Sequence, residues 1–194
     1  MHNRILTNFV DKSKTAEQPA LKGINYTSEY IYATDGKTII RIPNKTEFTG
    51  LYDLQGHILE ERYPNIPDYV RNESPIKATF SNVSEVLRAV TMLKPFNVME
   101  TVLFSFDTDG CKITAENMDF SAEAKVWLDA ETPEPFKMAF NASHLIKMLR
   151  AYEIWFGTKT LITFNMSEPN KALQIETPEL FLATMPVVWA NYDE

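Results

Sequence analysis

Residues Tyr30–Pro43 have the sequence YIYATDGKTIIRIP, and this stretch predicts a β-hairpin. Two runs rich in aromatic and β-branched residues, which favour strands, lie on either side of Asp35-Gly36. An Asp-Gly pair between two such runs is typical of a type I′ turn, because that turn needs positive φ at both central residues. We therefore expect Asp35 to shape a turn and not to act as a catalytic acid.

The same pattern recurs along the chain. A second Asp-Gly pair, Asp109-Gly110, lies between alternating apolar residues in TVLFSFDTDGCKITAEN and predicts another hairpin. Helices are expected over Asn3–Asp11, Ser81–Leu93 and Phe140–Tyr152, where apolar residues recur at helical spacing. Each helix is followed by strands, so a unit of one short helix and three or four strands occurs three times. The pattern predicts an α+β fold with antiparallel sheets.

The caps and the remaining strands follow from local sequence. Ser81 or Asn82 is expected to cap the second helix, and Asn141 or Ser143 the third. Gly50–Arg62 predicts a strand pair around Gly56, and the two prolines of YPNIPDYV predict an extended connector. Further strands are expected in ALKGINY, SEYIYAT, KTIIRIP, AEAKVWLDA, LITFNM, KALQIET and ELFLATMPV.

Composition excludes several classes of protein. The net charge is 19 − 26 = −7, which argues against binding nucleic acid over the whole surface but leaves room for a basic face. The single cysteine, Cys111, excludes an internal disulfide and a cysteine-rich zinc site. No apolar run approaches the roughly 20 residues that span a bilayer, and the first residues lack a signal-peptide pattern. We expect a cytoplasmic protein without a membrane partner.

Catalytic and metal-binding motifs are missing from the sequence. There is no glycine-rich phosphate loop, no H-E-x-x-H and no G-x-S-x-G. His2, His57 and His144 are far apart in sequence, and we expect surface or capping roles for them. Asp107-x-Asp109-Gly110 begins like a calcium loop, but the glycine comes too early and a strand follows. We expect no enzyme activity, no catalytic residue, no metal and no cofactor.

Several stretches resemble the bacterial DNA sliding clamp, the β subunit of DNA polymerase III. CKITAENMDFSAEAKVWL, FNASHLIKMLRAY and ETPELFLATMPV resemble, in this order, a hairpin, a helix and the last strand of its C-terminal domain. QPALKGINY with YIYATDGKTII resembles its middle domain, and ERYPNIPDYV the connector between the two. The resemblance implies a DNA clamp architecture with antiparallel sheets outside and short helices on the inner face. Residues 1–72 would form a shortened clamp-like domain, about half of a repeat pair, and residues 73–194 a full one.

The resemblance also implies functional residues. Sliding clamps hold double-stranded DNA weakly, by topology, with a modest excess of basic side chains on helices that line the ring. Here the implied DNA-binding residues are Lys12, Lys14, Arg88, Lys94, Lys147 and Arg150. Scattered solvated charges on helix faces are the alternative interpretation, and Glu85 weakens the basic pattern. The implied pocket for a polymerase or other clamp-binding peptide consists of Thr34, Lys37, Ile39, Pro64, Tyr69, Ala183, Met185, Pro186 and Val187. For Met185, Pro186 and their neighbours, the alternative is that they simply pack in the core at the end of a strand.

Two functions remain open at the level of sequence. The first is a processivity factor that forms a homo-oligomeric ring and tethers a polymerase or repair protein to DNA. The second is a clamp-fold interaction module or regulator that binds protein partners without encircling DNA. The basic helices and the retained pocket motifs favour the first, whereas the missing half-domain favours the second.

Overall fold

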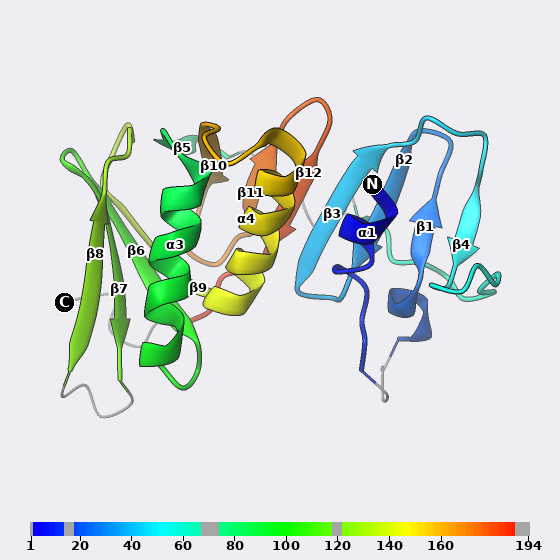
Figure 1. The fold of residues 1–194 in the computed structure, drawn as a ribbon, viewed down its shortest axis with the longest axis horizontal. Helices are drawn as coiled ribbons and strands as arrows, with labels where there is room; N and C mark the ends of the chain where they lie inside the picture. The colour runs from blue at the N-terminus through cyan, green and yellow to red at the C-terminus, as the bar shows by residue number, and fades with distance from the viewer. Residues whose placement is uncertain (1, 14–17, 67–73, 118–121, 189–194) are drawn as a thin grey trace. The chain divides into compact units, whose positions relative to one another are not determined.

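A computed structural model describes residues 2–13, 18–66, 74–117 and 122–188 (Figure 1). The chain forms two compact units: unit 1 comprises residues 1–71 and 176–183, and unit 2 comprises residues 72–175 and 184–194. Residues 176–183, which the resemblance assigns to the second clamp-like domain, belong to unit 1. The boundary between clamp-like domains at residues 72 and 73 remains a prediction.

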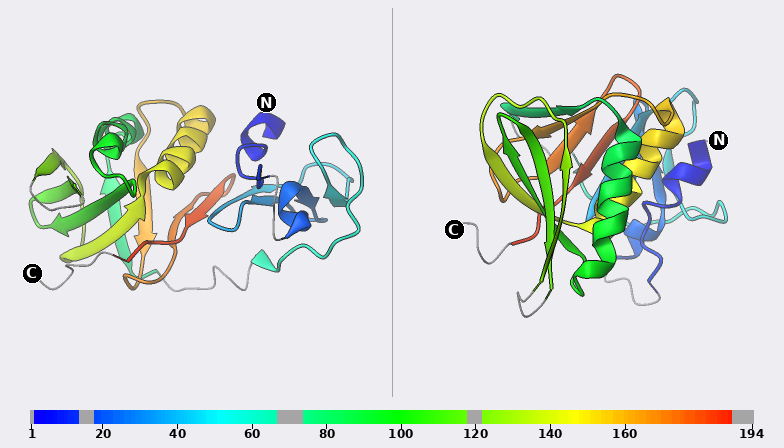
Figure 2. Two further views of the ribbon diagram at one scale, coloured as in Figure 1. Left: turned by 90° about the horizontal axis from the view of Figure 1, so that it is seen from below. Right: turned by 60° about the vertical axis from the view of Figure 1, so that its left-hand side comes forward.

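Unit 2 combines two helices with two groups of strands. In the first group, the strand order is β11 (Leu173–Glu176), β10 (Ile162–Met166) and β5 (Ile76–Phe80). In the second group, the order is β8 (Glu123–Leu128), β7 (Gly110–Glu116), β6 (Thr101–Asp107) and β9 (Phe136–Asn141). The helices are α3 (Val83–Leu93), extended by the 3-10 turn η2 (Lys94–Phe96), and α4 (Ala142–Phe156). Figure 2 shows both helices on the same side of these strands.

The core of unit 2 lies between helices and strands and is aromatic. Phe104 packs against Phe140 and Phe164 with ring centroids 5.7 and 6.1 Å apart, and Phe80 lies 5.2 Å from Phe164. All four rings are buried, and so is Cys111, whose thiol pKa is raised by burial. Large rings at such distances contribute packing energy beyond their buried area.

The predicted helices and hairpin of unit 2 are confirmed with shifted ends. Asn82 caps α3 by accepting from the Ser84 N–H at 3.0 Å, and Asn141 caps α4 by accepting from the His144 N–H at 3.2 Å. α4 begins later than expected and continues to Phe156. Strand β9 was not predicted, because Pro133 and Pro135 masked the alternation that begins at Phe136. The β6–β7 turn consists of Thr108 and Asp109, since Asp107 pairs with Gly110.

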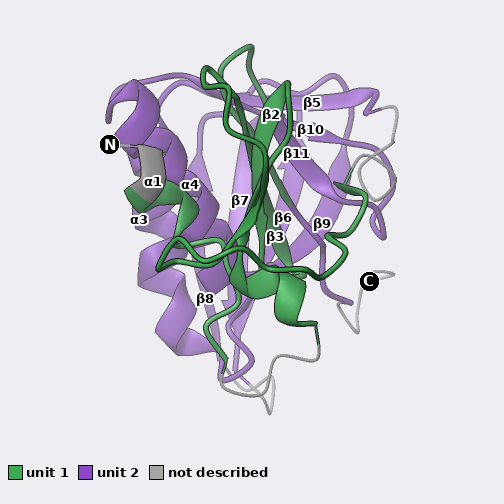
Figure 3. Ribbon diagram, turned by 90° about the vertical axis from the view of Figure 1, so that its right-hand side faces the viewer, with its two compact units in different colours: residues 1–71, 176–183 green, residues 72–175, 184–194 purple. Residues whose placement is uncertain are grey.

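In its described residues, unit 1, green in Figure 3, contains a sheet and the short helix α1. Its strands follow the order β4-β1-β2-β3-β12, with bounds Gly50–Tyr52, Ile24–Tyr26, Tyr30–Thr34, Thr38–Pro43 and Phe181–Thr184. The pairs β4–β1, β1–β2 and β2–β3 are antiparallel. Residues 176–183 join this unit because β12 is the neighbour of β3.

Three sequence-based expectations for unit 1 are wrong in detail. The first helix, α1, covers only His2–Leu6, and the chain then turns with hydrogen bonds of the i→i−3 type, although Phe9 and Val10 are buried as expected. ALKG is not a strand, because Pro19 starts the 3-10 turn η1 (Pro19–Lys22). Only β4 and one isolated bridge, Tyr52 to Ile58, form around Gly56.

The Asp35-Gly36 hairpin forms, but its turn is not of type I′. Gly36 has φ +82°, whereas Asp35 does not have a positive φ, and pairing of Thr34 with Ile39 leaves a four-residue loop. The Asp35 carboxylate accepts from the N–H groups of Lys37 at 3.0 Å and Thr38 at 2.7 Å, and from the Thr38 hydroxyl at 2.9 Å. Such hydrogen bonds from nearby amides to a side chain stabilise a loop that does not have the geometry of a two-residue type I′ turn.

We expect Asp35→Ala to lower the free energy of unfolding by about 1–3 kcal/mol, because the substitution leaves amides of the loop without their acceptor. Thermal and urea unfolding followed by circular dichroism would measure the change. Asp109→Ala, in the turn between β6 and β7, is the matched control and should change stability by no more than about 0.5 kcal/mol. Equal effects of both substitutions would contradict this role of Asp35.

Candidate nucleic-acid interface and peptide-binding residues

Helix α3 exposes a mixed face. Val83, Val86, Ala89, Val90 and Leu93 are buried, as their spacing requires. The opposite face carries Glu85, Arg88 and Met92, all exposed. Leu87 is only half-buried. Arg88 therefore points its charge to solvent, next to the carboxylate of the same helix face three residues earlier.

Helix α4 presents the more basic face. Ser143, Lys147, Arg150 and Ile154 follow one another at intervals of four, three and four residues, so they lie on one side of the helix. Arg150 is exposed and Lys147 is half-buried, whereas Leu145, Met148 and Leu149 are buried. Lys147 and Arg150, two of the implied DNA-binding residues, therefore lie on the same side of α4.

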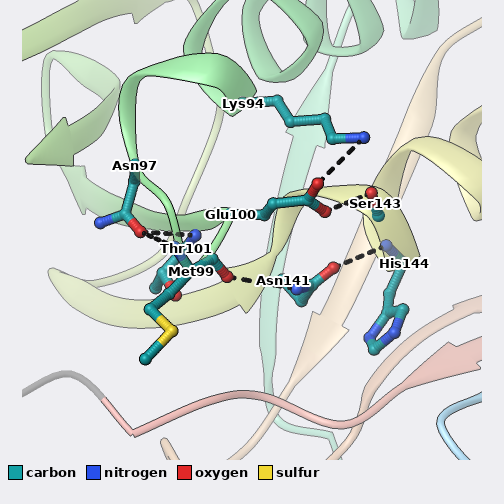
Figure 4. Close-up of polar contacts among 8 residues, drawn as sticks. All are labelled: Lys94, Asn97, Met99, Glu100, Thr101, Asn141, Ser143 and His144. Carbon is teal, nitrogen blue, oxygen red and sulfur yellow. Dashed lines mark hydrogen bonds and ion pairs between the residues drawn. The ribbon is translucent and has the colours of Figure 1, made fainter. Parts of the chain in front are cut away.

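Polar contacts join α3 and α4 at both ends. Each contact connects the start of one helix with the end of the other, so the two helices are antiparallel. At the start of α3, the Ser84 hydroxyl reaches the Glu153 carboxylate near the end of α4. At the other end, the Glu100 carboxylate accepts from the Ser143 hydroxyl at the start of α4 and lies 3.2 Å from the Lys94 ammonium, which follows α3 (Figure 4).

Glu100 has a left-handed backbone, with φ +53°, and is the only non-glycine residue with positive φ in the described part of the chain. Its N–H donates to the Asn97 carbonyl at 2.8 Å, and its carbonyl accepts from the Ala142 N–H at 2.6 Å. The Asn97 side chain accepts from the Met99 N–H at 2.8 Å and donates to the Glu116 carbonyl at 2.6 Å. Residues other than glycine rarely adopt a positive φ, and the surrounding hydrogen bonds hold Glu100 in this conformation.

The environment of Glu100 favours its ionised form. The hydrogen bond from Ser143 and the nearby charge of Lys94 lower the pKa of the Glu100 carboxyl below its ordinary value, against a smaller effect of burial. The carboxylate is therefore charged at neutral pH and offsets the charge of Lys94. Lys94, implied as a DNA-binding residue, is half-buried in this ion pair.

The helix pair has only a slight basic excess. Arg88, Lys147 and Arg150 carry three positive charges, and Glu85 and Glu153 carry two negative ones, which leaves 3 − 2 = +1. Lys12 is exposed but lies in unit 1, and Lys14 lies outside the described residues. Arg88, Lys147 and Arg150 are the implied DNA-binding residues that the structure brings to one helix pair.

The implied peptide-binding residues fall in both units. In unit 1, Lys37 is exposed and Ile39 half-buried on the β2–β3 hairpin, whereas Thr34 is buried and its hydroxyl bonds to the Thr38 carbonyl at 2.8 Å. Ala183 is buried on β12, and Pro64 is half-buried in the connector. In unit 2, Met185 is 49% exposed, and Pro186 and Val187 are half-buried. Tyr69 lies outside the described residues.

Sequence reasoning missed two side chains of unit 1. Arg41 lies between the rings of Tyr30 and Phe181, 4.7 Å from each centroid, and its guanidinium is 3.0 Å from the Glu176 carboxylate. Tyr63 has a buried hydroxyl, and burial raises its pKa. The aromatic-proline pair Tyr63-Pro64 was a visible signal, but nothing local connects Arg41 with residues more than a hundred positions away.

The described residues contain no cluster of three or more histidine, cysteine, aspartate or glutamate side chains suited to hold a metal ion. Within the same ranges, no helix combines the length and the apolar character needed to cross a bilayer.

Comparison with solved structures identifies the fold. The DnaN sliding clamp (DNA polymerase III subunit beta) of Bartonella birtlesii, bound to griselimycin, matches with a TM-score of 0.83 at 13% identity, covering 97% of this chain and 64% of that chain. The DNA polymerase sliding clamp of Bacillus subtilis gives 0.81 at 15% identity, over 96% and 62%. That of Pseudomonas aeruginosa gives 0.80 at 12% identity, over 97% and 64%.

No protein-family model and no curated protein matches the sequence. The chain thus has the α+β fold of the sliding clamps, and it spans a little under two thirds of the length of these clamps. The resemblance inferred from short motifs is confirmed for the fold.

We expect Glu100→Gln to weaken the dependence of stability on acid. Because the pKa of Glu100 is lowered in the folded chain, its stabilising effect is present above the ordinary glutamate pKa and is lost as the pH falls through the lowered value. The variant should therefore melt below the parent chain at pH 7, and the difference should shrink toward pH 3. Melting curves by circular dichroism across this range are the measurement. Glu134→Gln, on an exposed loop, should show no such trend.

Proposed function

We propose that this chain is a sliding-clamp-like protein that tethers a polymerase or another replication or repair protein to double-stranded DNA. The observation that carries the proposal is the clamp fold over 97% of the chain, with a TM-score of 0.83. The second support is that α3 and α4 pack against each other and carry Arg88 and Arg150, which are exposed, and Lys147, which is half-buried. A rigid helix pair presents these charges at a constant spacing to a phosphate backbone.

The charge distribution suits a weak and mobile contact with DNA. The body of the protein is acidic, with a net charge of −7, and repels phosphates elsewhere on its surface. A small basic excess on the helices attracts the duplex without holding it at one position, and each phosphate contact weakens as salt rises. Affinity for open-ended DNA is accordingly low, and retention depends on a closed assembly.

The proposal includes a homo-oligomer in which several copies of the protein enclose the duplex. Among the implied pocket residues, Lys37 of unit 1 and Met185 of unit 2 are exposed, and we propose each of them as a contact of a partner peptide. This activity requires no bond-making chemistry, and we propose no enzymatic role, no cofactor and a place in the cytoplasm.

A second candidate is an interaction module that binds clamp partners without encircling DNA. The ion pair between Lys94 and Glu100 and the near balance of charge on α3 and α4 favour it, because they weaken the attraction to phosphates. The reduced size of unit 1 favours it as well. The two candidates differ in whether an intact circular duplex retains the protein.

We expect a ring to be retained on closed circular DNA and to be lost when that DNA is linearised, because a ring slides off free ends. Light scattering would give the oligomeric state, and gel filtration with each form of DNA would give the retention. Lys147→Glu with Arg150→Glu should lower retention on circles about tenfold or more, since it reverses two charges that face phosphates.

Lys45→Glu with Lys171→Glu makes the same change in charge away from the helices and is the control. Circular dichroism would show that both variants fold. A monomer with equal weak retention on both DNA forms would overturn the ring and favour the interaction module.

We expect griselimycin, the ligand of the Bartonella birtlesii clamp structure, to bind this chain in a manner that depends on Met185. Isothermal titration calorimetry would measure the affinity of the parent chain and of Met185→Glu, which should bind at least about tenfold more weakly because a charge replaces a flexible apolar contact. Met92→Glu alters another exposed methionine, 64% accessible on α3, and should bind like the parent. Equal binding by all three proteins would remove Met185 from the pocket.

A further inference from the structure

A groove of about 630 Å³ lies on the strand order β8-β7-β6-β9, on the face that does not pack against α3 and α4. Successive residues of a strand point to opposite faces. Phe104, Cys111 and Ile113 point into the core and are buried, so Ser105 and Lys112, their neighbours, belong to the outer face. Neither the clamp-like helix surface nor the implied peptide pocket includes this groove.

One row of the groove is basic and aromatic. The register places Trp127 opposite Lys112, Lys112 opposite Ser105, and Ser105 opposite Lys137, so these side chains cross four strands in a line. The Lys112 ammonium lies 5.9 Å from the centre of the Trp127 ring, and Trp127 is 55% exposed. Such a row offers a flat ring and two cations to an aromatic and acidic ligand.

The next row contains a buried hydroxyl that lacks a partner. Thr114 lies opposite Leu103 and is 3% exposed, and its Oγ1 has no hydrogen-bond partner among the described residues. The Glu116 Oε2, on the same strand face, is buried and likewise unpartnered within those ranges. Buried polar atoms are nearly always hydrogen-bonded, because leaving one unpaired costs about 1–3 kcal/mol. Thr114 therefore points to a ligand of this groove.

The chain itself already enters the edge of this groove. Val187 packs against Leu103 and Ala139, and its N–H donates to the Ala139 carbonyl at 2.9 Å. Ala139 belongs to β9, the outermost strand of this order, so Val187 extends the sheet by one backbone bond. Leu103 also lines the groove, so Val187 contacts one of the groove's own residues.

We propose that the groove is the docking site of residues 189–194 of this chain, with the sequence Trp-Ala-Asn-Tyr-Asp-Glu. Six extended residues reach about 20 Å, and three strand spacings cover about 14 Å, so the segment is long enough to cross the groove. Trp189 and Tyr192 match the aromatic lining, and Asp193 and Glu194 match Lys112 and Lys137. The groove is also lined by Asp107, Glu116 and Glu123, so only the row with the two lysines suits the acidic end of the segment. Polar groups of the segment supply the partner that Thr114 needs.

The test uses the full chain and a variant of it in which the segment is disabled by Trp189→Ser, Tyr192→Ser, Asp193→Lys and Glu194→Lys. The probe is a fluorescent peptide with the sequence of residues 187–194, and its anisotropy reports binding. We expect the disabled variant to bind the peptide saturably and the parent chain to bind it at least tenfold more weakly, because its own segment occupies the groove.

Two changes within the disabled variant locate the site. Lys112→Glu with Lys137→Glu should weaken peptide binding at least tenfold, and Thr114→Val, which keeps the side-chain shape, should weaken it severalfold. Lys45→Glu with Lys171→Glu is the control and should leave binding unchanged. Circular dichroism would establish that each protein is folded.

Absence of saturable binding, equal binding by the parent and the disabled variant, or equal loss in the control would overturn the proposal. A parent chain that is dimeric by light scattering, and monomeric once the segment is disabled, would also overturn it in favour of docking between copies. The proposal stands independently of the DNA-tethering function, because neither DNA nor griselimycin enters the measurement.

Discussion

The ionised carboxylate of Glu100 is the contact on which the helix surface of unit 2 depends. It bonds to Ser143 at the start of α4 and pairs with Lys94 after α3, while its strained backbone connects to Ala142 and Asn97. Together with Ser84 and Glu153 at the opposite end, it sets the two helices antiparallel at a constant offset. These end contacts, together with the buried apolar faces of both helices, hold the pair that carries Arg88, Lys147 and Arg150.

The same contact limits how strongly that surface attracts DNA. Glu100 offsets one of the cations that the sequence pattern implied, and Glu85 and Glu153 offset part of the rest. A small excess on an acidic body suits a protein that encloses DNA and slides, since tight binding would stop movement. It suits an interaction module equally well if no ring forms. The outer face of the strands β8-β7-β6-β9 carries two further cations, Lys112 and Lys137, in the row with Trp127. Basic side chains of unit 2 therefore lie on two separate surfaces.

Local sequence accounted for the elements whose signals lie within a few residues. The caps Asn82 and Asn141, the apolar stripe of α3 and the two Asp-Gly hairpins were all predictable, because each rests on spacing or on one side chain beside its own backbone. The type of turn at Asp35 was not, since Asp35 holds the loop by three accepted hydrogen bonds instead of adopting positive φ. Strand β9 was missed because the prolines before Phe136 obscured it.

By itself, the sequence determined the α+β class, the hairpins, the helices of unit 2 and a resemblance to sliding clamps, because periodicity and turn residues are local properties. Only the tertiary structure assigned residues 176–183 to unit 1, where Arg41 stacks on Phe181 and pairs with Glu176. It also buried Thr114 in a groove, where its hydroxyl has no hydrogen-bond partner among the described residues. These features depend on contacts between distant strands and helices, and a burial or charge partner far along the chain leaves no mark in the residues beside it.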